Sequence, residues 1–268
     1  MQAYVLSRIR SKHARRPEQN KLTQSQFKVD LIAKQFAQCA MSSFTPNILE
    51  RGVLMSSKIL LITGDFGEDY EVIVPFMLLK AIGYEVHVAC PQKREGDTVA
   101  SSIHDINKNY QTVTEWEGHR ININVALDHL NPADYIALVL PGGRSCEYLR
   151  TYPIVREVTS HFIIENKPIA SICRGVQILL ATGLLKGKTM TGNFVCETEV
   201  QMAGNTYEKL NYEGVVVDGN IVYGVEWHGL WAWMKAFMDK LGVAIDLPPK
   251  DGRVKPIPGE GYTYKSLG

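Results

Sequence analysis

Three continuous apolar segments constrain the fold of this chain more than any other feature. They are KILLIT (58–63), DYIALVLP (134–141) and PIASI (168–172). A strand with one face in water alternates polar and apolar residues, so uninterrupted apolar runs predict strands that are buried on both faces. Segments with helical spacing, at 68–83 and 147–167, separate them. This alternation predicts an α/β domain with a mostly parallel sheet covered by helices on both faces.

The remaining elements follow from local pattern. Gly83 is expected to end the first helix, Pro75 predicts a kink or a late start in it, and Pro153 predicts a break in the second. Residues 91–130 are polar and irregular, with short alternating pieces. The other expected elements are strand 84–90, helix 174–185, strand 187–192, helix 195–204, hairpin 213–224 with an Asp218-Gly219 turn, and helix 230–242 with Trp231 and Trp233 in the core or at an interface.

The charge distribution divides the chain. Residues 1–54 carry nine Lys and Arg against three Asp and Glu, whereas residues 55–268 carry 20 against 25. The basic segment is interpreted as a leader, either disordered or a mitochondrial or plastid transit peptide. Residues 55–243 would form the domain, and residues 244–268 a Pro/Gly-rich tail. The expected location is the cytoplasm, or one of the two organelles if the leader is a transit peptide.

The composition argues against several classes of function. A formal net charge of +1 gives no reason to expect a nucleic-acid partner. No apolar run approaches the roughly 20 residues of a membrane helix. The five cysteines are scattered and form no CxxC pair, which argues against a disulfide framework and a zinc site and favours a reducing compartment. Phosphate-binding glycine loops are also missing from the sequence. We therefore expect no metal and no cofactor.

Residues capable of chemistry follow three of the predicted strands, in GDFGEDYE, PGGRSCEYLR and SICRG. Carboxyl ends of parallel strands meet at one edge of a sheet, where α/β proteins place their sites. Cys173 lies at a strand-to-helix junction between the small residues Ser171 and Gly175, as in a nucleophile elbow. At the amino end of helix 174–185 the thiol is expected to have a low pKa. The alternative is an inert cysteine that ends a core strand.

The longer segments GDFGEDYEVIVPFMLLKAIGYEVHVACP, VLPGGRSCEYLR, KPIASICRGVQILLATGLLKGK and VVVDGNIVYG resemble the DJ-1/PfpI family. The resemblance covers about residues 56–243 and is strongest to tandem-domain plant members, some of which act as glyoxalase III. It implies a flavodoxin-like three-layer sandwich, related to class I glutamine amidotransferases. It also implies a homo-oligomer.

The resemblance assigns roles to particular residues. Cys173 falls on the elbow nucleophile and Glu68 on its acidic partner. Gly143, with Gly142 beside it, falls on the donor of the oxyanion pocket. Glu147 falls on a glutamate that reaches across a subunit interface in PfpI-like members, and Arg144 is expected at the same interface.

Arg174 departs from the family pattern. PfpI-like proteases and plant glyoxalases have histidine after the cysteine, whereas this chain has CRG. Histidine exchanges protons near neutral pH, but arginine stays protonated. Arginine can hold a thiolate or bind a carboxylate or phosphate in the pocket. His228 is a candidate base if the fold brings it to Cys173.

Three hypotheses for the function are open. The first is glyoxalase III-like conversion of methylglyoxal and glyoxal to hydroxy acids, with a small carbonyl as substrate. The second is a redox-sensing, stress-responsive, chaperone-like module without turnover, in which Cys173 is oxidised. The third is a PfpI-like peptidase or amide hydrolase, which the missing histidine disfavours. Whether the chain is an enzyme therefore depends on what Arg174 does.

Overall fold

A six-stranded sheet forms the centre of the protein, whose computed structural model describes residues 57–244. Its strand order is β10-β11-β7-β6-β1-β3, and every neighbouring pair is parallel except β10 with β11. The strands are β1 (Lys58–Ile62), β3 (Glu85–Ala89), β6 (Tyr135–Leu140), β7 (Ile169–Ile172), β10 (Val215–Asp218) and β11 (Ile221–Gly224). The three apolar segments are the central strands β1, β6 and β7, as predicted.

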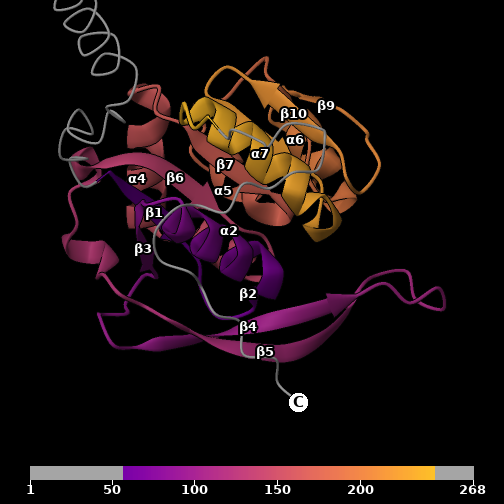
Figure 1. The fold of residues 1–268 in the computed structure, drawn as a ribbon. Coiled ribbons are helices and arrows are strands. Elements are labelled where there is room, and N and C mark those ends of the chain that lie inside the picture. Colours follow the sequence, from indigo (N-terminus) through magenta and orange to yellow (C-terminus); the bar gives the residue numbers. More distant parts are fainter. Residues whose placement is uncertain (1–56, 245–268) are drawn as a thin grey trace, which may run out of the picture. The chain divides into compact units, whose positions relative to one another are not determined.

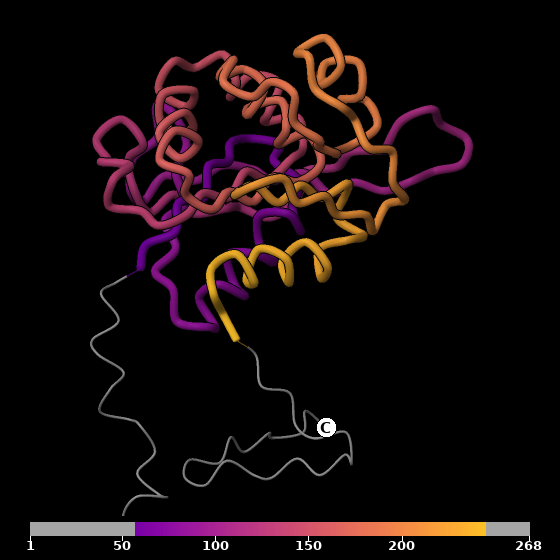
Figure 2. The backbone as a smooth tube through the Cα atoms, turned by 90° about the horizontal axis from the view of Figure 1, so that it is seen from above, coloured from indigo at the N-terminus to yellow at the C-terminus, as the bar shows by residue number. Residues whose placement is uncertain are grey.

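Helices cover both faces of this sheet. Ile59 and Leu61 of β1 pack in a core with α2 (Asp69–Ala81) and α7 (Leu230–Lys240). Leu60 and Ile62 point the other way, into a core with α4 (Pro153–Ile164), α5 (Val176–Leu180) and α6 (Glu197–Met202). The helices lie on opposite sides of the sheet in both views (Figures 1 and 2). Because both faces are buried, the strands need apolar residues at every position, and the three-layer α/β sandwich is confirmed.

The helices differ in detail from the prediction. α2 begins at Asp69 and continues through Pro75, so the helix does not start late. The break predicted at Pro153 is confirmed: the segment 147–167 forms two helices, α3 (Ser145–Leu149) and α4, and Pro153 is the first residue of α4. Proline is well accommodated there because the first helical N–H groups have no partner within the helix.

A second sheet occupies the region predicted to be irregular. β4 (Thr98–Asp105) pairs antiparallel with β5 (Thr114–Asn122), and β2 (Gly67–Glu68) adds in parallel to β4. Most of β5 is exposed or half-buried, so it lacks the apolar face by which strands are recognised in sequence. This sheet lies beyond α2 (Figure 1). It carries His104 and Glu115 toward the site described below.

The last third of the domain follows the prediction closely. The hairpin is β10 and β11, with Gly219 and Asn220 as its loop, one residue later than expected. Trp233 is fully buried, while Trp231 is exposed. The remaining elements are β8 (Thr189–Met190), β9 (Thr206–Tyr207) and the 3₁₀ turns η1 (Leu127–His129), η2 (Pro132–Asp134), η3 (Cys173–Gly175), η4 (Phe194–Cys196) and η5 (Trp227–Gly229).

The predicted leader, residues 1–54, and nearly all of the predicted tail lie outside the described residues. Within residues 57–244, no helix combines the length and apolar character needed to cross a membrane.

Candidate active site

Four adjacent strands end at the same edge of the main sheet, in the order β11, β7, β6 and β1. The three segments singled out in the sequence follow β7, β6 and β1, and the structure brings them together there. The N–H of Glu68, after β1, donates to the carbonyl of Gly142, after β6, at 3.3 Å. Ser145 donates in the same way to the carbonyl of Phe66 at 3.2 Å. The loops after these strands are therefore hydrogen-bonded into one frame.

Cys173 follows β7 directly and has a φ of 56°, a left-handed value that non-glycine residues rarely adopt. The thiol side chain is 2% exposed and packs in the core beneath the loops. Gly175 permits this turn, because a Cβ there would lie 2.2 Å from the carbonyl oxygen of Leu140. The strained turn and the small neighbour are the features of a nucleophile elbow.

The electrostatics of the thiol differ from the expectation. The helix predicted over 174–185 is the short turn η3 followed by five residues of α5. Burial, and then the charges of Glu71 and Glu226, raise the pKa of the Cys173 thiol well above its usual value. The prediction of a low pKa is therefore wrong, because burial among carboxyls outweighs the end of so short a helix.

Glu71 is the carboxyl that meets the thiol. Its side chain is fully buried and lies near Cys173: a Cβ on Gly142 would lie 2.6 Å from the Cβ of Cys173 and 2.7 Å from Oε2 of Glu71. Its Oε2 accepts the N–H of Gly142 at 2.7 Å. Burial, and then the charge of Glu68, raise the pKa of Glu71 well above its ordinary value. Because two adjacent buried anions repel, the thiol and this carboxyl favour keeping at least one proton between them.

Glu68, predicted as the acidic partner, has a different place. It is the N-cap of α2, and its Oε2 accepts the N–H of Glu71 at 2.8 Å. Burial raises the pKa of Glu68 to about 8. A cap side chain must turn back to its own helix, whereas the residue three positions later is free to face Cys173. The structure therefore places Glu71, not Glu68, against the thiol.

The backbone N–H groups of Gly142 and Gly143, which follow β6, have different partners. The N–H of Gly143 lowers the pKa of the Cys173 thiol, against the larger effect of burial, so this backbone donor lies near the sulfur. Gly143 has a φ of 80°, and a Cβ there would lie 2.4 Å from the backbone nitrogen of Glu68. The N–H of Gly142 is taken by Glu71, so Gly142 orients the carboxyl, and Gly143 stays the candidate oxyanion donor.

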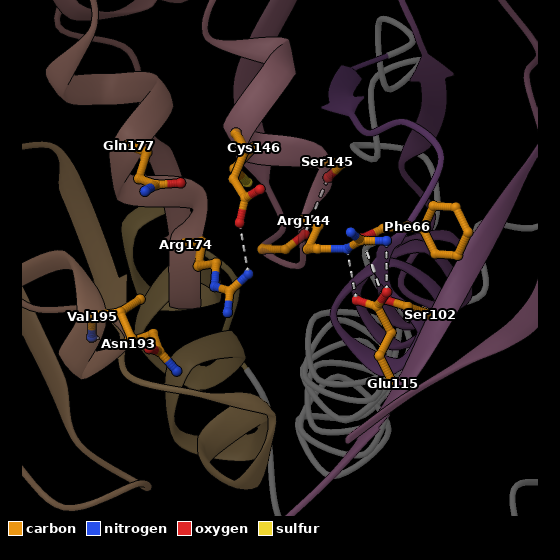
Figure 3. Close-up of polar contacts among 12 residues, drawn as sticks. Phe66, Ser102, Glu115, Arg144, Ser145, Cys146, Arg174, Gln177, Asn193 and Val195 are labelled. Atoms are coloured by element: carbon orange, nitrogen blue, oxygen red, sulfur yellow. Dashed lines mark hydrogen bonds and ion pairs between the residues drawn. The ribbon is translucent and has the colours of Figure 1, made fainter. Parts of the chain in front are cut away.

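Two arginines, one after β6 and one after β7, form ion pairs (Figure 3). Arg174 donates from Nη1 to Oε1 of Glu147 at 3.0 Å, and Arg144 pairs through Nη2 with Oε1 of Glu115 at 2.9 Å. The guanidinium of Arg144 also lies 5.0 Å from the ring centre of Phe66. Both ion pairs form within one chain, and contacts of Glu147 and Arg144 across a subunit interface stay predictions.

Arg174 acts on other ionisable groups around the site. Its charge lowers the pKa of Glu226, opposing the larger effect of burial. It also contributes to the lowered pKa of His104, for which burial is the main cause. His104 is buried and lies 3.1 Å from Glu115. Arg174 therefore places a positive charge near two acidic residues, Glu147 and Glu226.

Glu226 is a site residue that the sequence interpretation missed. It follows β11, is 1% exposed, and accepts a hydrogen bond from the side chain of Asn193. Nδ1 of His228 lies 3.7 Å from its Oε2, and the His228 ring stacks on Trp227 and Tyr212. His228 is thus the neighbour of Glu226. The available signal was an acidic residue placed directly after the buried strand of GNIVYGVEW.

No cluster of three or more His, Cys, Asp or Glu side chains suited to a metal ion occurs among residues 57–244. The groups at this site are a thiol, several buried carboxyls, a backbone N–H and an arginine. Such a set can support nucleophilic attack by sulfur and proton transfer by a carboxyl.

Comparison with known proteins places this arrangement in a family. The model of the DJ-1/PfpI family matches residues 57–240, so the chain belongs to the DJ-1/PfpI family. Protein DJ-1 homolog D of Arabidopsis thaliana is 39% identical over 191 residues, which are 71% of this chain and 49% of that protein. Deglycase PfpI of Pyrococcus furiosus is 34% identical over 184 residues, which are 69% of this chain and 99% of that protein.

Solved structures agree with the fold. A two-domain protein of Anabaena variabilis, with DJ-1/ThiJ/PfpI-like and ferritin-like domains, matches 74% of this chain and 52% of its own, with 26% identity and a TM-score of 0.59. DJ-1 of Schizosaccharomyces pombe matches 69% of this chain and 91% of its own, with 18% identity and a TM-score of 0.57. This chain spans about half the length of its Arabidopsis relatives, while it covers nearly all of the archaeal deglycases.

Proposed function

We propose that this protein is a cofactor-independent enzyme that converts small reactive dicarbonyls, such as methylglyoxal, to hydroxy acids. The observation that carries the proposal is the proximity of Cys173, strained at the end of β7, to the buried carboxyl of Glu71, since a Cβ on Gly142 would meet both side chains. Relatives that bear the name deglycase support an enzymatic role at the level of the family. The proposal keeps the glyoxalase III-like hypothesis and moves the proton-transfer role from Glu68 to Glu71.

The proposed reaction begins at sulfur. Cys173 attacks the aldehyde carbon of methylglyoxal, a C–S bond forms, and the thiol proton ends on the carbonyl oxygen, giving a hemithioacetal. The N–H of Gly143, beside the sulfur, stabilises the oxygen while it carries negative charge.

Glu71 performs the next transfer in this scheme. Its carboxylate takes the proton from the carbon bonded to sulfur, which gives an enediol, and returns a proton to the neighbouring carbon. The product is a lactate thioester of Cys173. Water then cleaves the C–S bond, releasing lactate and restoring the thiol. The net reaction adds one water to methylglyoxal and requires no oxidant or reductant.

The test follows lactate as well as methylglyoxal, using the full chain. Cys173→Ser should form no lactate, while Cys90→Ser, a matched change at another buried thiol outside the site, should retain the activity. Loss of methylglyoxal without lactate would mean adduct formation, and lactate from Cys173→Ser would refute the role of the thiol.

A further inference from the structure

Glu226 and Cys173 leave neighbouring strands at the same edge of the sheet. β11 and β7 are parallel, with Gly224 opposite Ile172. Cys173 comes one residue after Ile172, and Glu226 comes two residues after Gly224. The pairing of the strands therefore holds the two side chains on adjacent turns, whatever the surrounding loops do.

Asn193 links these two residues. Its backbone N–H donates to the carbonyl of Cys173 at 3.1 Å, and its side-chain amide donates to Oε1 of Glu226. The other oxygen of Glu226, Oε2, is buried and accepts no hydrogen bond from any residue in 57–244. A buried carboxylate oxygen without a donor is unfavourable by about 1–3 kcal/mol or more. This arrangement suits a carboxyl that carries a proton for part of the time.

Several charged groups surround the carboxyl of Glu226. Burial raises the pKa of Glu226 to about 7, and the positive charge of Arg174 opposes that rise. The negative charge of Glu226 in turn raises the pKa values of Glu68 and Glu71, which lie at the start of α2. His228, from η5, lies 3.7 Å away. Ionised Glu226 also raises the pKa of the Cys173 thiol.

We propose that Glu226 and Cys173 share one proton, so that Glu226 becomes protonated when the sulfur becomes an anion. The S–H bond then breaks without adding net charge to the buried site, since the carboxylate loses its charge as the thiolate gains one. PfpI-like proteases and plant glyoxalases have a histidine next to the cysteine, and histidine exchanges protons near neutral pH. Arg174 cannot do so because arginine stays protonated. Glu226 would supply this proton exchange instead. This rests on the proposed function only in taking Cys173 as the reactive thiol.

The experiment measures the rate of Cys173 alkylation by iodoacetamide from pH 5 to pH 10, with each cysteine quantified by peptide mass spectrometry. In the unchanged protein the rate should rise over a wider pH range than a single ionisation allows. In Glu226→Gln the alkylation rate should rise over a narrower range and at lower pH, because the negative charge of Glu226 no longer raises the pKa of the thiol. A displacement of one pH unit gives roughly tenfold faster alkylation in the rising part of the profile.

Two variants and an internal check control this measurement. Glu226→Asp retains the charge and should retain the broad profile, and Glu213→Gln removes an exposed charge and should change nothing. Cys146 and Cys196 are fully buried, so their alkylation would reveal a variant that has lost its fold. In that case Glu226→Met, another neutral side chain of similar volume, replaces Glu226→Gln in the comparison, because Glu71 can also broaden the profile of the unchanged protein.

A single-ionisation profile in the unchanged protein, or an unshifted midpoint in folded Glu226→Gln, would overturn the proposal. Lactate formation, measured on the same samples, tests the proposed reaction separately from the shared proton. A shifted profile in a protein that forms no lactate would support the shared proton and refute the proposed reaction.

Discussion

Replacing Glu71 by Gln isolates proton transfer from packing at this site. Glutamine has nearly the same volume, and its amide oxygen can still accept the N–H of Gly142, which Glu71 now accepts at 2.7 Å. What disappears is the ability to take and return a proton. General acid–base groups contribute typically 10²- to 10⁴-fold to rate, so we expect a loss of that size in kcat/KM for methylglyoxal. At 1.36 kcal/mol per factor of ten, this is about 3–5 kcal/mol of transition-state stabilisation.

Glu68→Gln is the matched control. The amide oxygen can still cap α2 by accepting the N–H of Glu71, so the helix start is retained. Because burial raises the pKa of Glu68 to about 8, the side chain is mostly uncharged at pH 7, and the neutral glutamine should change the stability little at that pH. Turnover should stay within about threefold of the unchanged protein, because in the proposed scheme the proton passes through Glu71.

The assay is steady-state methylglyoxal consumption with lactate quantified, run in H₂O and in D₂O. A carboxyl exchanges its proton with solvent, so lactate formed in D₂O should carry deuterium at the carbon that Glu71 reprotonates. If Glu68→Gln lost a hundredfold and Glu71→Gln stayed active, the assignment made from the structure would be wrong. Lactate without deuterium would exclude an enediol that exchanges with water.

Three further predictions concern stability. Trp233→Ala should destabilise the domain by about 3–5 kcal/mol in urea unfolding, because Trp233 is fully buried, whereas Trp231→Ala should change little. Gly175→Ala should cost about 1–3 kcal/mol or more through the clash after β7, while Gly183→Ala, with open space at its Cβ position, should cost about 1–2 kcal/mol from backbone strain alone. Stability should fall as pH rises from about 4.5 to about 7: the native pKa of Glu226, about 7, lies above its unfolded value of 4.5, so the folded state binds more protons in this range, and a flat profile would contradict this.

The layers of the fold follow from the pattern of apolar residues along the chain. Continuous apolar strands such as KILLIT can only be stable with both faces covered, and the helical segments between them supply that cover. The same logic located the edge of the sheet where Cys173 and the glycines after β6 meet, because parallel strands bring their carboxyl ends together. The second sheet escaped prediction because β5 is largely exposed, while β4 is mostly buried but consists largely of small and polar residues that do not form an apolar run.

Which groups ionise together depends on the packing of distant segments against one another. Glu68 and Glu71 are both acidic residues in the first turn of one helix, and local pattern cannot tell which one caps the helix and which one faces the thiol. Glu226 lies more than 50 residues from Cys173 along the chain and becomes its neighbour through the pairing of β11 with β7. The raised pKa of Cys173 has the same origin, since burial and the approach of distant charges are properties of the packed site and not of the segment SICRG.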